Sequence, residues 1–142
     1  MTPPTILLVE DTDADAETVQ RALGRCLPGA RVRRVRTARE ALAVLHDGTL
    51  PPDLLLADLS LPDATGLALL SEVRRGRGTA NLPVVLLTGT AHQSEVDAAY
   101  AGGAQGFLVK PLAPSDTERV LGRVCDYWFR AVRRPSTDGS RR

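Results

Sequence analysis

The segment "VEDTDADAE" holds five carboxylates directly after the apolar run "TILLV". Negative side chains repel one another, so a cluster of this kind needs a cation or other favourable partners. Asp11, Asp13 and Asp15 have the 1, 3, 5 spacing of a calcium-binding EF-hand loop. The rest of that loop is missing, because Ala16 stands in place of the turn glycine and Ala22 in place of the closing glutamate. These two missing residues argue against a calcium site.

The five acids divide into two groups by expected geometry. Asp13, Asp15 and Glu17 are expected to open a helix, with Asp13 as its N-cap, because acids in a first turn complement the helix dipole. Glu10 and Asp11 remain at the carboxyl end of a strand. Two such acids are either solvated loop residues or part of a cation site that takes further ligands from elsewhere.

Five short apolar runs separated by helical patterns predict the fold. The runs cover residues 5–9, 32–35, 53–58, 83–87 and 106–109. Helical capping patterns follow two of them, "TARE" and "SDTE". Five alternating strand and helix units predict an α/β fold, a five-stranded parallel sheet with helices on both faces. We expect the flavodoxin-like strand order 2-1-3-4-5.

Such a sheet brings the carboxyl ends of its strands to one crevice, where α/β folds bind ligands. Asp58 ends the third run, Thr88 ends the fourth and Lys110 follows the fifth, so these residues should meet Glu10 and Asp11. Three neighbouring carboxylates need a cation, and carboxylates with water and space for a phosphate suit Mg²⁺. The crevice therefore predicts a magnesium site.

The lysine is a second indication of phosphate chemistry. The chain has seventeen arginines and one lysine, and that lysine is Lys110. A compact ammonium differs from a planar guanidinium where one phosphoryl oxygen must be met at short range.

Four segments together resemble the receiver domain of two-component response regulators: "LLVED", "DLLLADLSLPDATG", "VVLLTG" and "GAQGFLVKP". The resemblance implies that Asp58 is the phosphoacceptor. It also implies that Mg²⁺ is bound by Asp11, Asp58 and the backbone carbonyl of Ser60, with Glu10 acting directly or through water.

The same resemblance assigns the remaining roles. Thr88 would be the switch hydroxyl, Lys110 the partner of a phosphoryl oxygen and Phe107 the switch aromatic, and a cis peptide is expected before Pro111. Three positions depart from the common pattern. Glu10 replaces an aspartate, Thr65 stands where an acid or amide often precedes the turn glycine, and Phe107 lacks a tyrosine hydroxyl, so its switching must work through packing.

The expected domain plan is a receiver domain over residues 1–130 and a C-terminal extension with a flexible tail over residues 131–142. Without an output domain, the signal should pass through a protein contact. Tyr127, Trp128 and Phe129 are consecutive aromatics and are candidates for that contact surface.

The segment "CDYWFRAVRRP" resembles the C-terminal extension of single-domain regulators paired with bacterial phytochrome histidine kinases. This resemblance implies a sensor histidine kinase, specifically a bacteriophytochrome, as the partner. It also implies a homodimer through the fourth helix, the fifth strand, the fifth helix and the extension.

Composition limits the other function classes. The chain of 142 residues is 43% hydrophobic, carries a net charge of +1, and contains neither a signal peptide nor an apolar run long enough to cross a membrane. We expect a cytoplasmic protein that binds neither membrane nor nucleic acid. The basic segment "RVRRVR" alternates with valines as an edge strand would.

The sequence therefore predicts a phosphoacceptor signalling protein, not an enzyme, with self-catalysed phosphotransfer and dephosphorylation. Two alternatives remain open. One is a receiver fold that is never phosphorylated and acts as a docking module. The other is a small aspartyl phosphatase. The segment "DTDAD" superficially resembles the DxDx[TV] motif of haloacid dehalogenase-like phosphatases, although Asp15 stands where that motif has threonine or valine.

Overall fold

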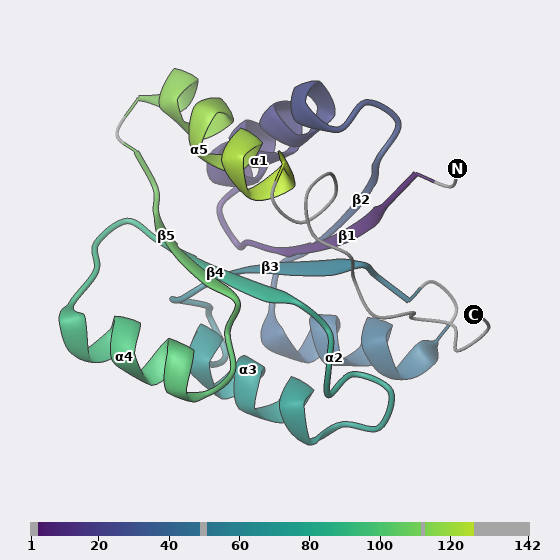
Figure 1. Cartoon of the computed structure of the whole chain (residues 1–142). Coiled ribbons are helices and arrows are strands. Elements are labelled where there is room, and N and C mark those ends of the chain that lie inside the picture. The colour runs from purple at the N-terminus through teal and green to yellow at the C-terminus, as the bar shows by residue number, and fades with distance from the viewer. Residues whose placement is uncertain (1–2, 49–50, 112, 127–142) are drawn as a thin grey trace.

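The computed structural model describes residues 3–48, 51–111 and 113–126. Five parallel strands form one sheet in the order β2-β1-β3-β4-β5, as predicted (Figure 1). The strands are β1 (Thr5–Val9), β2 (Arg31–Val35), β3 (Leu54–Asp58), β4 (Val84–Thr88) and β5 (Gly106–Val109). The helices are α1 (Asp13–Cys26), α2 (Ala38–Asp47), α3 (Gly66–Arg75), α4 (Gln93–Ala101) and α5 (Pro114–Asp126).

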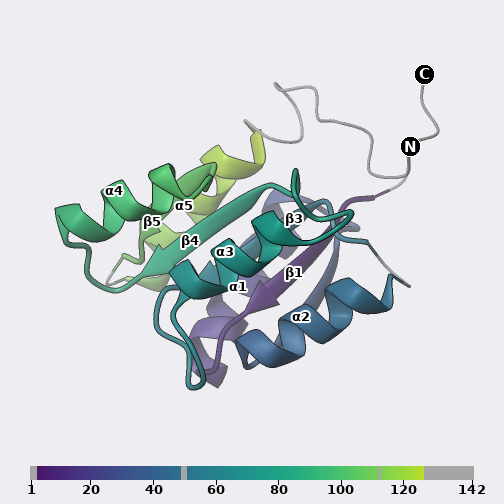
Figure 2. The same cartoon turned by 90° about the horizontal axis from the view of Figure 1, so that it is seen from below.

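The helices cover both faces of the sheet. Helices α1 and α5 lie on one face, and α2, α3 and α4 lie on the other, where the view from below shows them (Figures 1 and 2). The three central strands are therefore enclosed on both sides, which explains why their sequences are apolar without alternation.

Successive side chains of each central strand enter opposite halves of the core. In β1, Leu7 and Val9 pack with residues of α2, α3 and α4, whereas Ile6 and Leu8 pack with residues of α1 and α5. Strands β3 and β4 divide in the same way. The sheet thus separates two apolar clusters.

The basic segment forms the edge strand β2, as predicted. It pairs only with β1 in the sheet, and Arg31 and Arg33 are exposed. Arg34 is largely covered, with 18% of its side chain exposed, because it reaches over the loop that follows β1.

Helix ends correct two sequence-based expectations. Thr12, not Asp13, occupies the N-cap of α1, because the Asp13 carboxylate is taken up by Arg34 and Arg36. Helix α5 begins at Pro114, one residue before the predicted "SDTE" cap. The capping box that begins at Thr37 is confirmed, with the side chains and backbone of Thr37 and Glu40 bonded reciprocally.

The expected cis peptide before Pro111 is wrong, since the described residues contain no cis peptide bond. At a bond before proline the trans form is the more stable isomer by about 0.5–1 kcal/mol.

Within the part of the chain that the structure describes, no helix combines the length and the apolar character needed to cross a membrane.

Candidate functional site

The carboxyl ends of β1, β3 and β5 bring one cation and several acids together. The Nζ atom of Lys110 donates hydrogen bonds to Glu10 Oε1 at 2.7 Å and to Asp58 Oδ2 at 3.0 Å. These residues are 100 and 52 positions from Lys110 in the sequence. The sheet topology therefore assembles the group that the sequence predicted.

Glu10 lies at the bottom of the site and is fully buried. Its Oε2 atom accepts a hydrogen bond from the backbone N–H of Thr12 at 3.2 Å, and its Oε1 atom accepts from Lys110. Burial raises the pKa of the Glu10 carboxyl, and the bonds from Lys110 and Thr12 offset only part of that effect. The contact with Lys110 therefore favours the ionised form of Glu10, against the effect of burial.

Lys110 has the complementary environment. Burial alone would lower the pKa of its ammonium group, but the hydrogen bonds to Glu10, Asp15 and Asp58 outweigh burial and hold the pKa above its usual value. The ammonium group is therefore charged at physiological pH, as phosphate recognition requires.

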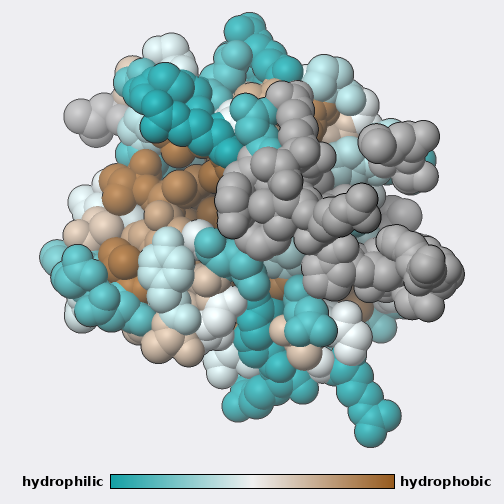
Figure 3. Space-filling model, viewed as in Figure 1, coloured by the Kyte–Doolittle hydropathy of each residue, from teal (hydrophilic) through white to brown (hydrophobic). Residues whose placement is uncertain are grey.

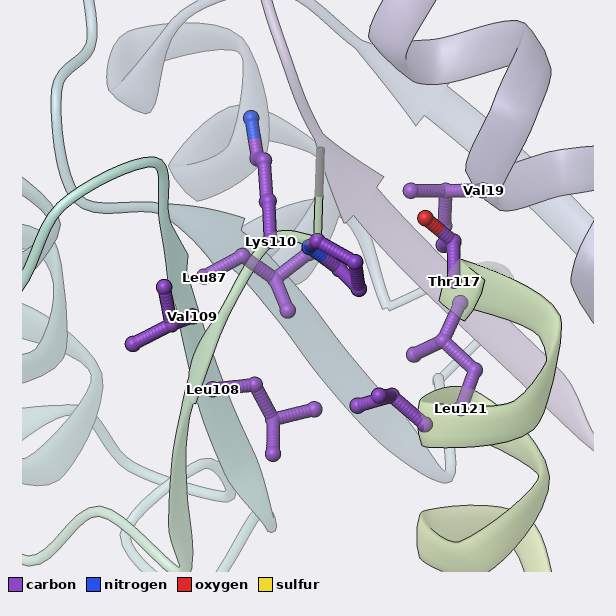
Figure 4. Close-up of a pocket in the computed structure, with 9 residues that line it drawn as sticks. Val19, Leu87, Leu108, Val109, Lys110, Thr117 and Leu121 are labelled. Atoms are coloured by element: carbon purple, nitrogen blue, oxygen red, sulfur yellow. The ribbon is translucent and has the colours of Figure 1, made fainter. Parts of the chain in front are cut away.

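An apolar hollow lies beside this lysine. Figure 4 shows the Lys110 side chain rising from the end of β5, away from Leu108 and Leu121. The hollow is lined by Val19, Leu87, Leu108, Val109, Lys110, Pro111, Thr117, Val120 and Leu121. The apolar residues thus border the lysine stem, while the ammonium group points toward the acids.

Three carboxylates at the site are close enough to share a metal ion. One oxygen from each of Glu10, Asp11 and Asp58 lies within 4.8 Å of the others. Hard oxygen donors at this separation fit a divalent cation such as Mg²⁺. These three acids belong to the predicted set of metal ligands, which also includes the backbone carbonyl of Ser60.

The loop after β3 holds Asp58 in place. The Oδ1 atom of Asp58 accepts a hydrogen bond from the backbone N–H of Ser60 at 3.2 Å. Gly66 packs directly against this strand end, because a Cβ atom at its position would lie only 2.7 Å from the Asp58 carbonyl oxygen. Glycine at this position therefore lets α3 begin close behind the Asp58 backbone.

Arg34 of β2 and Arg36, which follows this strand, support the loop after β1. Arg34 Nε donates to the carbonyl oxygen of Glu10 at 2.7 Å, and Arg36 Nη1 donates to that of Asp11 at 3.1 Å. Both guanidinium groups also bind the Asp13 carboxylate, and these bonds, with that from Arg34 the stronger, lower the pKa of Asp13. The segment from Glu10 to Asp13 is thus held by arginines at the end of the edge strand.

Sequence reasoning missed one member of the site. Asp15 was expected only to complement the dipole of α1, yet its Oδ2 atom accepts a hydrogen bond from Lys110 Nζ at 3.0 Å. The available signal was its position, because a residue in the first turn after β1 lies at the same sheet edge as Lys110.

Thr88 lies at this edge but does not contact Asp58 among the interactions of the described residues. Its hydroxyl group donates to the carbonyl oxygen of Thr90 at 2.6 Å, and its own carbonyl accepts from the backbone N–H of Lys110 at 2.6 Å. The Thr88 hydroxyl is therefore engaged by Thr90, and the Thr88 backbone is joined to Lys110 at the end of β5.

Comparison with known proteins identifies the family of this chain. Residues 6–121 match the response regulator receiver domain family. The chain belongs to this family. It is therefore a signalling protein of the two-component type.

Two regulatory proteins are similar to this chain along nearly its whole length. The probable methanogenesis regulatory protein FilR2 of Methanothrix harundinacea is 34% identical over 137 residues, which cover 94% of this chain and 88% of FilR2. The response regulator Rcp1 of Synechocystis is 29% identical over 139 residues, which cover 94% of this chain and 95% of Rcp1.

Solved structures of receiver proteins show the same fold. The phosphorylated cyanobacterial phytochrome response regulator RcpA has a TM-score of 0.88 at 27% identity, with 94% of this chain and 99% of RcpA covered. The Mn²⁺-bound form of Rcp1 has a TM-score of 0.85 at 29% identity, with 94% of this chain and 100% of Rcp1 covered. Rcp1 therefore binds a divalent cation, which agrees with the acidic cluster of this receiver domain.

The receiver domain exposes apolar side chains on the side formed by α4, β5 and α5. Tyr100 of α4 and Val109 of β5 are 51% and 49% exposed, and Figure 3 shows apolar surface over β5. Phe107 of β5 is half-buried and packs against the core below the sheet. The predicted interface residues Tyr127, Trp128 and Phe129 lie outside the described residues.

Proposed function

We propose that Asp58 accepts a phosphoryl group from a histidine of a sensor kinase in a magnesium-dependent reaction. The observation that carries this proposal is the position of the Asp58 carboxylate. One of its oxygens contacts the Lys110 ammonium at 3.0 Å, and the carboxylate lies within metal-sharing distance of Glu10 and Asp11. An acceptor, a fixed positive charge and a set of cation ligands therefore meet at one point.

The proposed transfer begins when an Asp58 carboxylate oxygen attacks the phosphorus of the phosphohistidine. A P–O bond forms, the P–N bond breaks with its electron pair on the imidazole nitrogen, and the ring, protonated at its other nitrogen, leaves as neutral imidazole of the kinase. Lys110 donates a hydrogen bond to an oxygen of the phosphoryl group and stabilises its developing charge. Attack by water on the resulting acyl phosphate would later release inorganic phosphate and restore Asp58.

Glu10, Asp11 and Asp58, with the backbone carbonyl of Ser60, would hold Mg²⁺ in this proposal. The bound ion supplies positive charge that reduces the repulsion between the acceptor carboxylate and the phosphoryl group. The carboxylate oxygens of the site support this assignment by their separation and their hard-donor chemistry.

We propose Thr88 and Phe107 as the switch residues. For Thr88 to bind the phosphoryl group, its hydroxyl must leave the carbonyl oxygen of Thr90, to which it donates at 2.6 Å. That movement would open space for Phe107 and change the surface of α4, β5 and α5. Phosphorylation would thereby become a change of protein surface.

The proposed output is a contact between proteins. We propose that residues 1–130 form the receiver domain and that residues 131–142 extend it. We also propose a homodimer through α4, β5, α5 and this extension, with Tyr127, Trp128 and Phe129 contributing. The exposed side chains of Tyr100 and Val109 support this choice of face, because exposed apolar groups mark interfaces.

A bacterial phytochrome kinase is the proposed phosphodonor. The support is the similarity to RcpA, described as a phytochrome response regulator, over 94% of this chain. A kinase of this kind uses ATP, so we place the reaction in the cytoplasm, and the proposed mechanism requires neither a membrane nor a nucleic acid.

The deciding experiment is intact mass measurement after incubation with acetyl phosphate, a small phosphodonor. A single phosphoryl adduct that requires Mg²⁺ and is absent from the Asp58→Asn variant is the expected result. Circular dichroism of that variant should show an unchanged fold. If the folded protein takes up no phosphoryl group from acetyl phosphate or from a purified histidine kinase, the docking-module alternative is correct.

A further inference from the structure

One carboxylate at the site has no part in the phosphotransfer described above. Asp15 lies in the first turn of α1, and its Oδ2 atom is 3.0 Å from Lys110 Nζ. An ammonium group has three hydrogens. Glu10, Asp15 and Asp58 each accept one hydrogen bond from it, so Asp15 completes its set of acceptors.

The three acceptors differ in their access to water. The Glu10 side chain is fully buried, the Asp58 side chain is 13% exposed and the Asp15 side chain is 47% exposed. Asp15 therefore holds the ammonium group on the open side of the site. Without it, one ammonium hydrogen would turn to water and the end of the lysine chain would have fewer fixed contacts.

The backbone of α1 fixes the place of Asp15. The next residue, Ala16, is 1% exposed and packs in the core below α1, which orients this turn of the helix. Glu17, two positions later, points to solvent with 73% of its side chain exposed and pairs with Arg21. Two acids of the same helix therefore have different partners, since Asp15 binds Lys110 and Glu17 pairs with Arg21.

A phosphoryl group on Asp58 would change the acceptors of Lys110. A phosphoryl oxygen would replace the Asp58 carboxylate as acceptor, while Glu10 and Asp15 could each keep one ammonium hydrogen. Two fixed acceptors would then direct the third hydrogen toward the phosphoryl group. A charged donor that is already oriented stabilises a transition state without reorganisation.

From this geometry we infer that Asp15 is a positioning residue that orients the Lys110 ammonium group for phosphoryl transfer to Asp58. The role rests on the proposed function, since it needs phosphoryl transfer at this site. The contact itself does not, and it can be measured in the unphosphorylated protein.

Because the chain has a single lysine, nuclear magnetic resonance can observe the contact directly. Protein labelled with ¹⁵N and ¹³C in lysine gives one side-chain ammonium signal, which reports Lys110. Asp15→Ala should shift this signal and speed the exchange of its hydrogens with water, while the matched variant Glu17→Ala should leave it unchanged. An unaltered signal in Asp15→Ala would overturn the inference.

The rate of phosphorylation by acetyl phosphate at saturating Mg²⁺ tests the role. We expect Asp15→Ala to slow the reaction on the order of tenfold, because misplaced catalytic groups cost rates of this size or more. Glu17→Ala should react at the original rate. Asp15→Glu, which restores an acid on a longer arm, should recover part of the loss.

A double-mutant cycle separates positioning from a simple charge effect. In a Lys110→Met background, Asp15→Ala should cause no further loss of rate, because the residue through which it acts is gone. An equal loss in both backgrounds, or a faster reaction in Asp15→Ala, would show that Asp15 acts through its own charge. If the chain without substitutions takes up no phosphoryl group from any donor, the proposed function and this role are both refuted. The lysine signal would still show whether Asp15 contacts Lys110.

Discussion

Asp63, in the loop after β3, accepts a hydrogen bond from the backbone N–H of Ala38 at 2.9 Å and thereby caps a helix that begins 25 residues earlier. Its second oxygen accepts from the N–H of Arg39 at 2.9 Å. The loop that positions Ser60 beside Asp58 is thus joined to the first turn of α2.

We expect Asp63→Ala to lower the free energy of unfolding by about 1 kcal/mol at neutral pH, the usual cost of a lost helix cap. The hydrogen bonds from Ala38 and Arg39 lower the pKa of Asp63, so its contribution is complete above the pKa of the unfolded chain. It is lost as the pH falls through the still lower pKa of the folded protein. Urea denaturation at several pH values should therefore show the two proteins converging in acid.

The control for this prediction is Asp47→Ala, which removes an exposed acid from the other end of α2. Loss of a negative charge near a helix C-terminus should be neutral or slightly stabilising. If Asp63→Ala and Asp47→Ala have the same stability at every pH, the cap has no energetic importance.

Gly66→Ala should disturb the phosphoacceptor through the backbone. The new Cβ atom would lie 2.7 Å from the carbonyl oxygen of Asp58, so strand or helix must shift at a cost of about 1–3 kcal/mol. The comparison is Gly24→Ala, an exposed position in α1 with no atom within 4 Å, which should gain up to about 1 kcal/mol. Thermal denaturation of both variants measures the difference, and equal effects would contradict the close packing of α3 on β3.

Mg²⁺ should stabilise the protein through the acidic cluster. Binding at 100 times the dissociation constant adds about 2.7 kcal/mol to the free energy of unfolding. Asp11→Asn should remove most of this gain and, without Mg²⁺, should be at least as stable as the original chain because it relieves repulsion among the acids. Melting curves with and without Mg²⁺ check both signs, and an undiminished gain in Asp11→Asn would place the ion elsewhere.

Lys110→Met should lower the rate of phosphorylation by acetyl phosphate on the order of 100-fold, the typical loss when one charge-stabilising donor is removed. It also leaves the buried Glu10 carboxylate without its cation, so stability should fall when the protein is free of Mg²⁺. Lys110→Arg keeps the charge and should remain better folded than Lys110→Met, yet should transfer slowly because a planar fork cannot replace the ammonium group. Normal phosphorylation in Lys110→Met would refute the role of this lysine.

The proposed dimer face predicts a change in mass in solution. Val109→Glu puts a charge at a half-exposed apolar position of β5, and removal of residues 127–142 deletes the three consecutive aromatics together with the extension. Each change should weaken association on sedimentation equilibrium, whereas Ala43→Glu, at an exposed position of α2, should not. An unchanged dimer in both test variants would locate the interface on another surface.

The fold and the meeting of Glu10, Asp58 and Lys110 could be predicted from the sequence because parallel strands bring their carboxyl ends to one edge. Apolar runs locate these ends within a residue or two, and the residue after each run is then placed by topology. Little knowledge of side-chain conformation is needed for that step.

The partners of individual acids could not be predicted in this way. Asp13 and Asp15 both fit a first helical turn, yet Asp13 binds arginines at the end of β2 and Asp15 binds Lys110. The N-cap prediction at Asp13 was wrong for the same reason, since long-range ion pairs that sequence spacing does not reveal determine which way each side chain turns.

The division of the core by the sheet has a consequence for how such a protein can evolve. Ile6 and Leu7 are neighbours in the chain, yet they belong to separate clusters, one with α1 and α5 and the other with α2, α3 and α4. Because substitutions without shared neighbours act almost additively, changes in one cluster leave the packing of the other nearly intact. A lineage can therefore remodel the surface carried by one set of helices while the opposite set keeps its shape, with the acidic edge between them unchanged.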